Sequence, residues 1–235
     1  MKKSLAALSV CSSLLAAPLA GAADLSYLFM PAALPGQHPS MLVMMHGYGA
    51  NEQDFNDFPV IVPGNMLVVS LRAPLPVAGD SYQWYRNNVS EQQEAEDVAQ
   101  SDDEVVRTVT TLQHQYHIPA SHTYLGGFSQ GAVMTYAVAL THPQLFHGVA
   151  VFSGRLPAGF DPSAVPLAAA KQLQVFVGHG EADQRIPLKN ALQAVKQLTT
   201  FTPSVTFKTY PGMGHTISLD EIRDFRQWLF HEETP

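Results

Sequence analysis

Short apolar runs separated by amphipathic stretches make up most of the chain after its first 22 residues. Six of these runs are rich in Val, Leu, Met and Phe and are apolar almost throughout, as strands covered on both faces of a sheet must be. We therefore predict six parallel strands, at residues 41–45, 66–69, 123–125, 149–152, 173–177 and 205–207. Residues 25–30 add a candidate antiparallel edge strand.

Helical periodicity fills the segments between these runs, with apolar residues three or four positions apart on one face. Four such faces are predicted: Val105, Val109, Leu112 and Tyr116; Val133, Ala137 and Leu140; Leu188, Leu192 and Val195; and Ile222, Phe225 and Leu229. The second helix should end before Pro143, and the last should begin at a capping box in residues 218–221. This alternation predicts one α/β domain over residues 23–235, with a mostly parallel sheet and helices on both faces.

Two segments show neither the apolar run of a buried strand nor the periodicity of a helix, at residues 74–100 and 155–171. Long irregular loops in a compact domain are more often part of a site than structural connections. We therefore expect both segments to form pocket walls.

The first 22 residues have the pattern of a secretory signal peptide. Lys2 and Lys3 precede an uncharged apolar run over residues 5–20, and Ala20-Gly21-Ala22 places small residues where a signal peptidase cleaves. The run is too short for a membrane anchor and contains Pro18, and no other segment is apolar enough to span a bilayer. We expect cleavage after Ala22 and export, either to the periplasm or to the medium.

Composition excludes several kinds of site and partner for the expected exported chain. The single cysteine lies in the leader, so we expect no disulfide, thiolate metal site or cysteine nucleophile in the mature protein. Loss of two lysines changes the formal charge from -7 to -9, and no basic cluster remains. An acidic chain of this kind is not expected to bind nucleic acid.

One short motif carries the most specific chemistry. The predicted strand at 123–125 leads into Gly127-Phe128-Ser129-Gln130-Gly131, which a predicted helix follows at once. In the pattern G-x-S-x-G, small residues two before and two after the serine allow a sharp turn that exposes its hydroxyl. Ser129 is therefore the candidate nucleophile, although a serine that merely caps the helix would also suit this position.

A serine nucleophile needs a base and a group that orients the base. His215 follows the predicted strand at 205–207, and Asp183 and Glu181 follow the strand at 173–177. Both places are carboxyl ends of strands, where open α/β sheets form their sites. The residues themselves leave either acid possible.

The sequence contains residues for two further candidate sites. Backbone amides of the glycine-rich turn at 46–49 and of Gln130 are candidates for an oxyanion hole, acting through main-chain groups whatever their side chains. His114 and His117 have helical spacing, but no nearby Cys, Asp or Glu completes a metal site. We therefore expect chemistry without a metal or cofactor.

The motifs taken together resemble the phospholipase/carboxylesterase family of α/β-hydrolases. The resemblance rests on residues 43–49, Arg72-Ala73-Pro74, Trp84-Tyr85, 127–131, His179-Gly180-x-x-Asp183-x-x-Ile186-Pro187 and 212–215. It implies an α/β-hydrolase fold, a triad of Ser129, His215 and Asp183, and oxyanion donors at the amides of Tyr48 and Gln130. The family includes carboxylesterases, lysophospholipases and acyl-protein thioesterases.

Trp84, Tyr85 and Met213 flank these elements, and we expect them to wall an apolar substrate pocket, although Trp84 could instead anchor its loop to the core. The expected function is an exported serine hydrolase of small carboxylic esters or lipids. Alternatives are a lysophospholipase, a depolymerase of polyesters or sugar esters, an amide-cleaving variant, and a non-catalytic binding module. The sequence determines neither the acyl chain length nor the oligomeric state.

Overall fold

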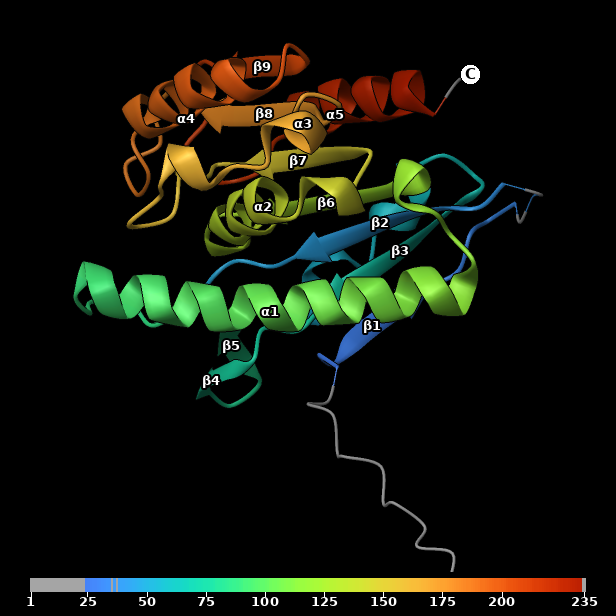
Figure 1. Cartoon of the computed structure of the whole chain (residues 1–235), viewed down its shortest axis with the longest axis horizontal. Coiled ribbons are helices and arrows are strands. Elements are labelled where there is room, and N and C mark those ends of the chain that lie inside the picture. Colours follow the sequence, from blue (N-terminus) through green and yellow to red (C-terminus); the bar gives the residue numbers. More distant parts are fainter. Residues whose placement is uncertain (1–23, 35, 37, 234–235) are drawn as a thin grey trace, which may run out of the picture.

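The computed structural model describes residues 24–34, 36 and 38–233. Within these residues, seven strands form one sheet in the order β1-β3-β2-β6-β7-β8-β9 (Figure 1). Six of them run parallel: β2 (Ser40–Met45), β3 (Met66–Leu71), β6 (Thr123–Phe128), β7 (Gly148–Phe152), β8 (Gln174–Gly180) and β9 (Val205–Tyr210). β1 (Tyr27–Met30) pairs antiparallel with β3 at one edge. The six predicted parallel strands and the predicted edge strand are confirmed.

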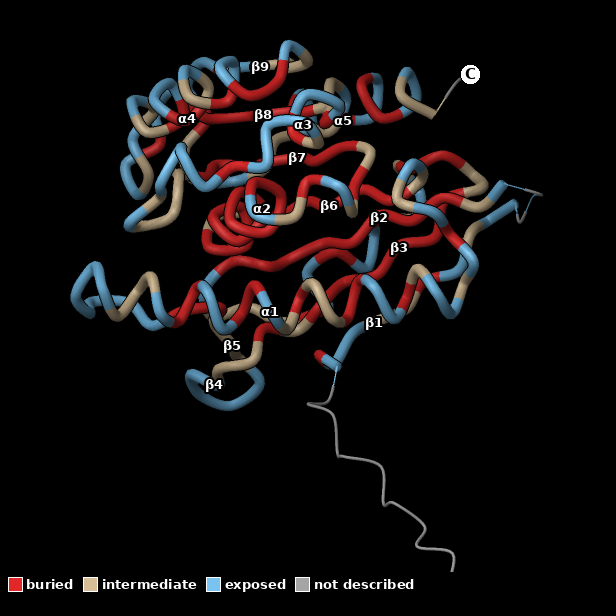
Figure 2. The backbone as a smooth tube through the Cα atoms, in the orientation of Figure 1, coloured by how far each residue is buried: buried red, intermediate tan, exposed pale blue. Residues whose placement is uncertain are grey.

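Helices cover both faces of this sheet. They are α1 (Glu91–Tyr116), α2 (Gln130–Thr141), α3 (Leu167–Ala170), α4 (Leu188–Phe201) and α5 (Leu219–Glu232). One core cluster joins the sheet to α1, α2, α3 and α4, and a second joins its other face to α5. Figure 2 shows the inner strands of the sheet, β2, β3, β6, β7 and β8, as the buried layer between these helices. The predicted α/β class is confirmed, and the described residues form one domain.

Alternate residues of each central strand enter opposite core clusters. In β2, Met41, Val43 and Met45 pack against the α1 and α2 side, whereas Leu42 and Met44 pack against the α5 side. Both sets are fully buried. This explains why the strand is apolar at every position, because neither face of a doubly covered sheet meets water.

The segment at 74–100 is more regular than predicted. Residues 75–83 form a hairpin of β4 (Leu75–Ala78) and β5 (Ser81–Gln83), and α1 already begins at Glu91. The prediction of an irregular loop up to residue 100 is wrong because the first ten residues of α1, 91–100, are mostly polar and carry no apolar stripe. The available signal was Ser90, whose hydroxyl accepts a hydrogen bond from the Gln93 N–H at 3.2 Å as an N-cap.

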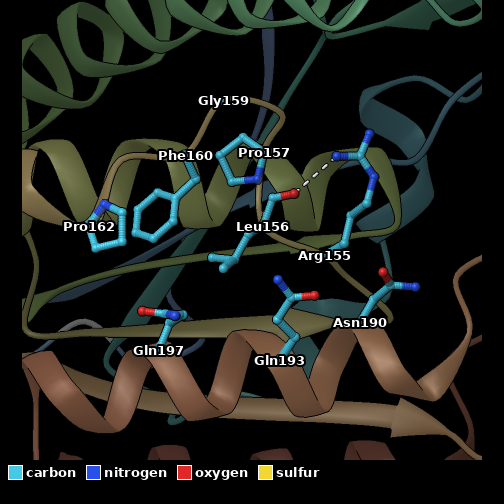
Figure 3. A pocket seen from close by; sticks show the side chains of 9 residues that line it. All are labelled: Arg155, Leu156, Pro157, Gly159, Phe160, Pro162, Asn190, Gln193 and Gln197. Carbon is cyan, nitrogen blue, oxygen red and sulfur yellow. Dashed lines mark hydrogen bonds between the residues drawn. The ribbon is translucent and has the colours of Figure 1, made fainter.

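The segment at 155–171 is largely irregular apart from a short 3-10 turn, η5 (Pro162–Ala164), and α3. It walls two hollows, one of about 290 Å³ against α4 and one of about 260 Å³ against α1 and α2. Figure 3 shows the first, in which Leu156 and Phe160 face amide side chains of α4. Ser129 lines neither hollow. The segment is a pocket wall, but these pockets are separate from the serine.

The predicted leader, residues 1–22, lies outside the described residues, and its cleavage and export stay predictions. Among the described helices, none combines the length and the hydrophobicity that a bilayer span requires.

A buried carboxylic acid lies at the start of α5. Ser218 and Glu221 form the predicted capping box, with the Ser218 hydroxyl accepting from the Glu221 N–H at 3.1 Å. The Glu221 side chain is fully buried, and its Oε1 has no hydrogen-bond partner among the described residues. Burial raises the pKa of Glu221 to about 8.

We expect Glu221→Gln to stabilise the fold increasingly as pH rises. The folded protein keeps a proton on Glu221 that the unfolded chain releases above its ordinary pKa of 4.5, so the wild type loses stability from there until about pH 8. Glutamine keeps the shape and cannot ionise. Denaturant unfolding between pH 4 and 9 measures the difference, and Glu91→Gln, on the exposed start of α1, is the control. A stability difference independent of pH would contradict the buried acid.

Candidate active site

Ser129 occupies a strained turn between β6 and α2. Its backbone has φ 55° and ψ -112°, a conformation that L-residues rarely adopt. A Cβ on Gly127 would overlap the backbone of Gly131, and a Cβ on Gly131 would overlap the carbonyl of Met45. The turn can therefore form only with glycine at both positions, which is the physical content of the G-x-S-x-G pattern.

The loops after β8 and β9 bring an acid and a histidine to this turn. The Ser129 hydroxyl lies 2.7 Å from Nε2 of His215. The other ring nitrogen of His215, Nδ1, lies 2.7 Å from Oδ2 of Asp183. Because an ionised carboxylate only accepts hydrogen bonds, Nδ1 carries the proton and Nε2 is left as an acceptor for the serine proton. The three groups thus form a chain suited to proton transfer.

Asp183 is held as a carboxylate. Burial acts to raise its pKa, but hydrogen bonds from His215 and from the N–H groups of Arg185 and Ile186 outweigh burial, and the net pKa lies below its ordinary value. The two N–H groups donate to Oδ1 at 2.8 and 2.9 Å, leaving Oδ2 for the histidine. A negative charge fixed in this way favours a positive charge on the ring of His215.

The alternative acid lies elsewhere. Glu181 is exposed, and its Oε1 accepts a hydrogen bond from the Thr209 hydroxyl at 2.8 Å. Asp183, two residues further on, is the acid that the structure brings to His215. His114 and His117 lie at the carboxyl end of α1 and line a surface hollow there. No group of three His, Cys, Asp or Glu side chains within the described residues could hold a metal ion.

The two candidate oxyanion amides flank the serine. Tyr48 follows β2, the neighbour of β6 in the sheet, and Gln130 is the first residue of α2. Neither backbone N–H donates to another group in the described chain. Tyr48 is 46% exposed, so its ring lies partly in solvent. Two such N–H groups can bind the oxygen of a tetrahedral intermediate.

The side chain of Gln130 matters as well as its amide, contrary to the expectation that only main-chain groups act here. Its Oε1 accepts from the Trp84 N–H at 2.7 Å, and its Nε2 donates to the Tyr85 carbonyl at 2.7 Å. All three residues are buried. The carboxamide therefore provides hydrogen-bond partners for the Trp84 N–H and the Tyr85 carbonyl, and it connects the loop before α1 to the start of α2.

Trp84 extends this connection to the turn after β2, which carries the other candidate oxyanion amide. Its indole N–H donates to the His46 carbonyl at 2.9 Å. The His46 ring lies 2.7 Å from the Gly47 carbonyl through Nδ1 and accepts from the Ala73 N–H at 3.1 Å through Nε2. Burial lowers the pKa of His46, so the ring is neutral and keeps this tautomer. A buried polar network thus joins both amide-bearing turns.

The sequence did not identify the His46 ring or the Gln130 carboxamide as part of the site. One signal was present, a histidine between a buried strand and a glycine-rich turn. A second was a glutamine at the first position of the mostly apolar helix α2. Neither signal indicates which residue is the hydrogen-bond partner, because the partners are far apart in the sequence: Gln130 and Trp84 are separated by 46 residues.

The candidate pocket residues are largely enclosed. Trp84 has no exposed surface, Tyr85 is 4% exposed and Met213 is 8% exposed. For Trp84, this burial and its hydrogen bonds favour the alternative role of a core anchor. Open space beside the histidine instead forms a cleft of about 450 Å³, lined by Phe128, Ala182, Gln184, Arg185, Gly214 and His215.

We expect Gln130→Ala to destabilise the fold. The variant leaves the buried Trp84 N–H and Tyr85 carbonyl without partners, at a cost of about 1 to 3 kcal/mol for each group. Denaturant unfolding measures this, with Gln227→Ala as the matched control because Gln227 is exposed on α5. Equal stability of the two variants would show that the carboxamide is not needed to hold the loop.

A family model described as phospholipase/carboxylesterase matches residues 33–231. A probable carboxylesterase of rice, Oryza sativa subsp. japonica, is 34% identical over 112 residues, which are 48% of this chain and 42% of the rice protein. Acyl-protein thioesterase 1 of Mycosarcoma maydis is 33% identical over 118 residues, covering 48% of this chain and 49% of that protein. The matched segments thus span less than half of each relative.

A solved structure extends the likeness to the whole fold. The phospholipase/carboxylesterase from Dyadobacter fermentans superposes with a TM-score of 0.73 at 24% identity, over 89% of this chain and 99% of that one. At this identity the superposition establishes a shared fold and nothing finer. The family model covers most of the chain, and it confirms the resemblance drawn from the motifs. This chain belongs to the phospholipase/carboxylesterase family of α/β-hydrolases.

Proposed function

We propose that this protein is a serine hydrolase of carboxylic esters, with Ser129 as nucleophile, His215 as base and Asp183 as the group that orients the base. The observation that carries the proposal is the continuous chain of two 2.7 Å contacts from the Ser129 hydroxyl through His215 to Asp183. Membership of the phospholipase/carboxylesterase family supports the same reaction class. The names of the relatives, a probable carboxylesterase and an acyl-protein thioesterase, also point to acyl transfer.

The reaction proceeds in two halves. His215 Nε2 takes the proton of Ser129 as the hydroxyl oxygen attacks the ester carbonyl, and the amides of Tyr48 and Gln130 stabilise the negative oxygen. His215 then gives this proton to the departing alcohol, which leaves an acyl group on Ser129. In the second half a water attacks the acyl-enzyme, with His215 again acting first as base and then as acid.

We further propose that the substrate is a small ester or lipid and that the protein works after export to the periplasm or the medium. Export rests on the signal-peptide pattern of residues 1–22. A lysophospholipase or a depolymerase of polyesters or sugar esters would use the same three residues and differ only in the pocket. A non-catalytic binding module would leave the Ser129 contacts without a use.

Ser129→Ala should abolish covalent labelling by a fluorophosphonate probe and lower kcat by about 10⁶-fold on p-nitrophenyl butyrate, because the nucleophile is lost. Ser163→Ala, on an exposed turn, is the control and should keep both properties. Labelling that persists in Ser129→Ala would place the nucleophile at another residue. A folded wild type that neither labels nor turns over any ester would favour the binding module.

Asp183→Asn should lower kcat by about 10⁴-fold, less than loss of the serine, because Asp183 orients His215 and stabilises its charge without taking its proton. Glu181→Gln is the control, since its carboxylate bonds Thr209 and points to a different partner. Steady-state kinetics on the same ester measures both variants. A greater loss in Glu181→Gln than in Asp183→Asn would reverse the assignment of the acid.

A further inference from the structure

Arg185 lies in the wall of the cleft that contains His215. The side chain is exposed and makes no hydrogen bond, ion pair or ring contact with another residue in the described parts of the chain. The cleft measures about 450 Å³, which is enough for a small polar group. Its other lining residues are Phe128, Ala182, Gln184, Gly214 and His215, so no carboxylate lines it.

The position of Arg185 is fixed relative to the proposed catalytic residues. Its backbone N–H donates to Oδ1 of Asp183 at 2.8 Å, and the Ile186 N–H donates to the same oxygen at 2.9 Å. The start of the Arg185 side chain is therefore held a short distance from the Asp183 and His215 pair. Only the long, flexible end of the side chain is free to follow a ligand.

Other arginines of the described chain have partners within the protein. Arg72 pairs with Glu52, Arg86 with Asp97, Arg107 with Asp24, Arg155 with Glu94 and Arg223 with Asp220, and Arg226 lies over the ring of Phe230. Figure 3 shows the guanidinium of Arg155 turned back to the Leu156 carbonyl, away from the amides across its pocket. Because the protein has a formal charge of -7, an arginine such as Arg185 that has no acidic partner in the described chain and lies beside the proposed catalytic residues is unusual.

Sheet order determines which part of a substrate meets Arg185. Tyr48 follows β2 on one side of β6, whereas Asp183 and His215 follow β8 and β9 on the other side. The acyl oxygen must point to the amides of Tyr48 and Gln130. The alcohol oxygen must lie at His215, which protonates it. The cleft on the His215 side therefore receives the alcohol part of the ester.

We propose that Arg185 binds an anionic group, phosphate or carboxylate, on the alcohol part of the ester substrate, an inference that rests on the proposed esterase function. A guanidinium offers several N–H donors in one plane and matches the oxygens of either anion. The amide of Gln184 adds a neutral donor in the same cleft. Arg185 thus determines specificity for the leaving group and takes no part in the bond-breaking steps.

Three butyryl esters test this on the full chain: butyrylglycerol, butyrylglycerol phosphate and the butyryl ester of glycerate. The acyl group is common to all three, so the ratio of kcat/KM for a charged ester to that for butyrylglycerol reports the anionic group alone. In the wild type we expect this ratio to exceed one at low salt and to fall at 0.5 M NaCl as the charges are screened.

Arg185→Gln should lower the ratio by about tenfold, between the effect of an exposed ion pair and that of a charge-assisted hydrogen bond. Arg185→Glu should lower it further, and Arg185→Lys should retain most of it. Lys196→Gln removes the same charge from an exposed position on α4 and should leave the ratio unchanged. A fall for the phosphate ester alone, or for the glycerate ester alone, identifies the anion and supports the proposal.

An unchanged ratio in both Arg185→Gln and Arg185→Glu would overturn the role of Arg185. An equal fall in Lys196→Gln would do so too, because the effect would then reflect net charge. Hydrolysis of neutral butyrylglycerol by the wild type reports the proposed esterase function separately. If that reaction is present while the charged esters show no preference, the inference about Arg185 fails and the proposed function stands.

Discussion

The strained turn at Ser129 is the constraint on which the rest of the site depends. At φ 55° the serine cannot relax into either the strand or the helix that it joins, and the conformation persists because β6 and α2 are both buried in the core. The two glycines are required because any side chain there would overlap backbone atoms of Gly131 or Met45. The strain thus places the hydroxyl above the carboxyl edge of the sheet, where the loops after β8 and β9 reach it.

A second level of organisation is the buried polar network around Trp84. Gln130, Trp84 and His46 connect the start of α2 to the turn after β2, so the two proposed oxyanion donors are held by one set of hydrogen bonds. Buried polar groups are costly unless each has a partner, and here the backbone groups of Trp84 and Tyr85 find theirs on a single carboxamide. The network makes a rigid site out of three loops distant in sequence.

Charge is distributed unevenly around this site. Asp183 is kept ionised by three hydrogen bonds, whereas Glu221, on the opposite face of the sheet, is kept protonated by burial with one oxygen unpartnered. Arg185 supplies the unpaired positive group at the cleft. The described chain therefore holds one carboxylate ionised beside His215, keeps another carboxyl group protonated in the core, and places an unpaired arginine at the cleft that contains His215.

The sequence by itself determined the fold class, the seven strands of the main sheet, the four principal helices, and Ser129 and His215 as candidate partners in one site. Doubly covered strands are apolar throughout, amphipathic helices carry a stripe, and the G-x-S-x-G turn has few alternative structures. The hydrophobic pattern did not predict the helix at residues 91–100, because this part of α1 is mostly polar and has no apolar stripe. The residues by themselves left both Asp183 and Glu181 possible as the acid, because both follow the same strand. Only the resemblance to the family selected Asp183. Only the tertiary structure decided which of the two acids reaches His215, that Trp84 is enclosed, and that the Gln130 side chain joins two loops, because these facts depend on contacts between residues far apart in the chain.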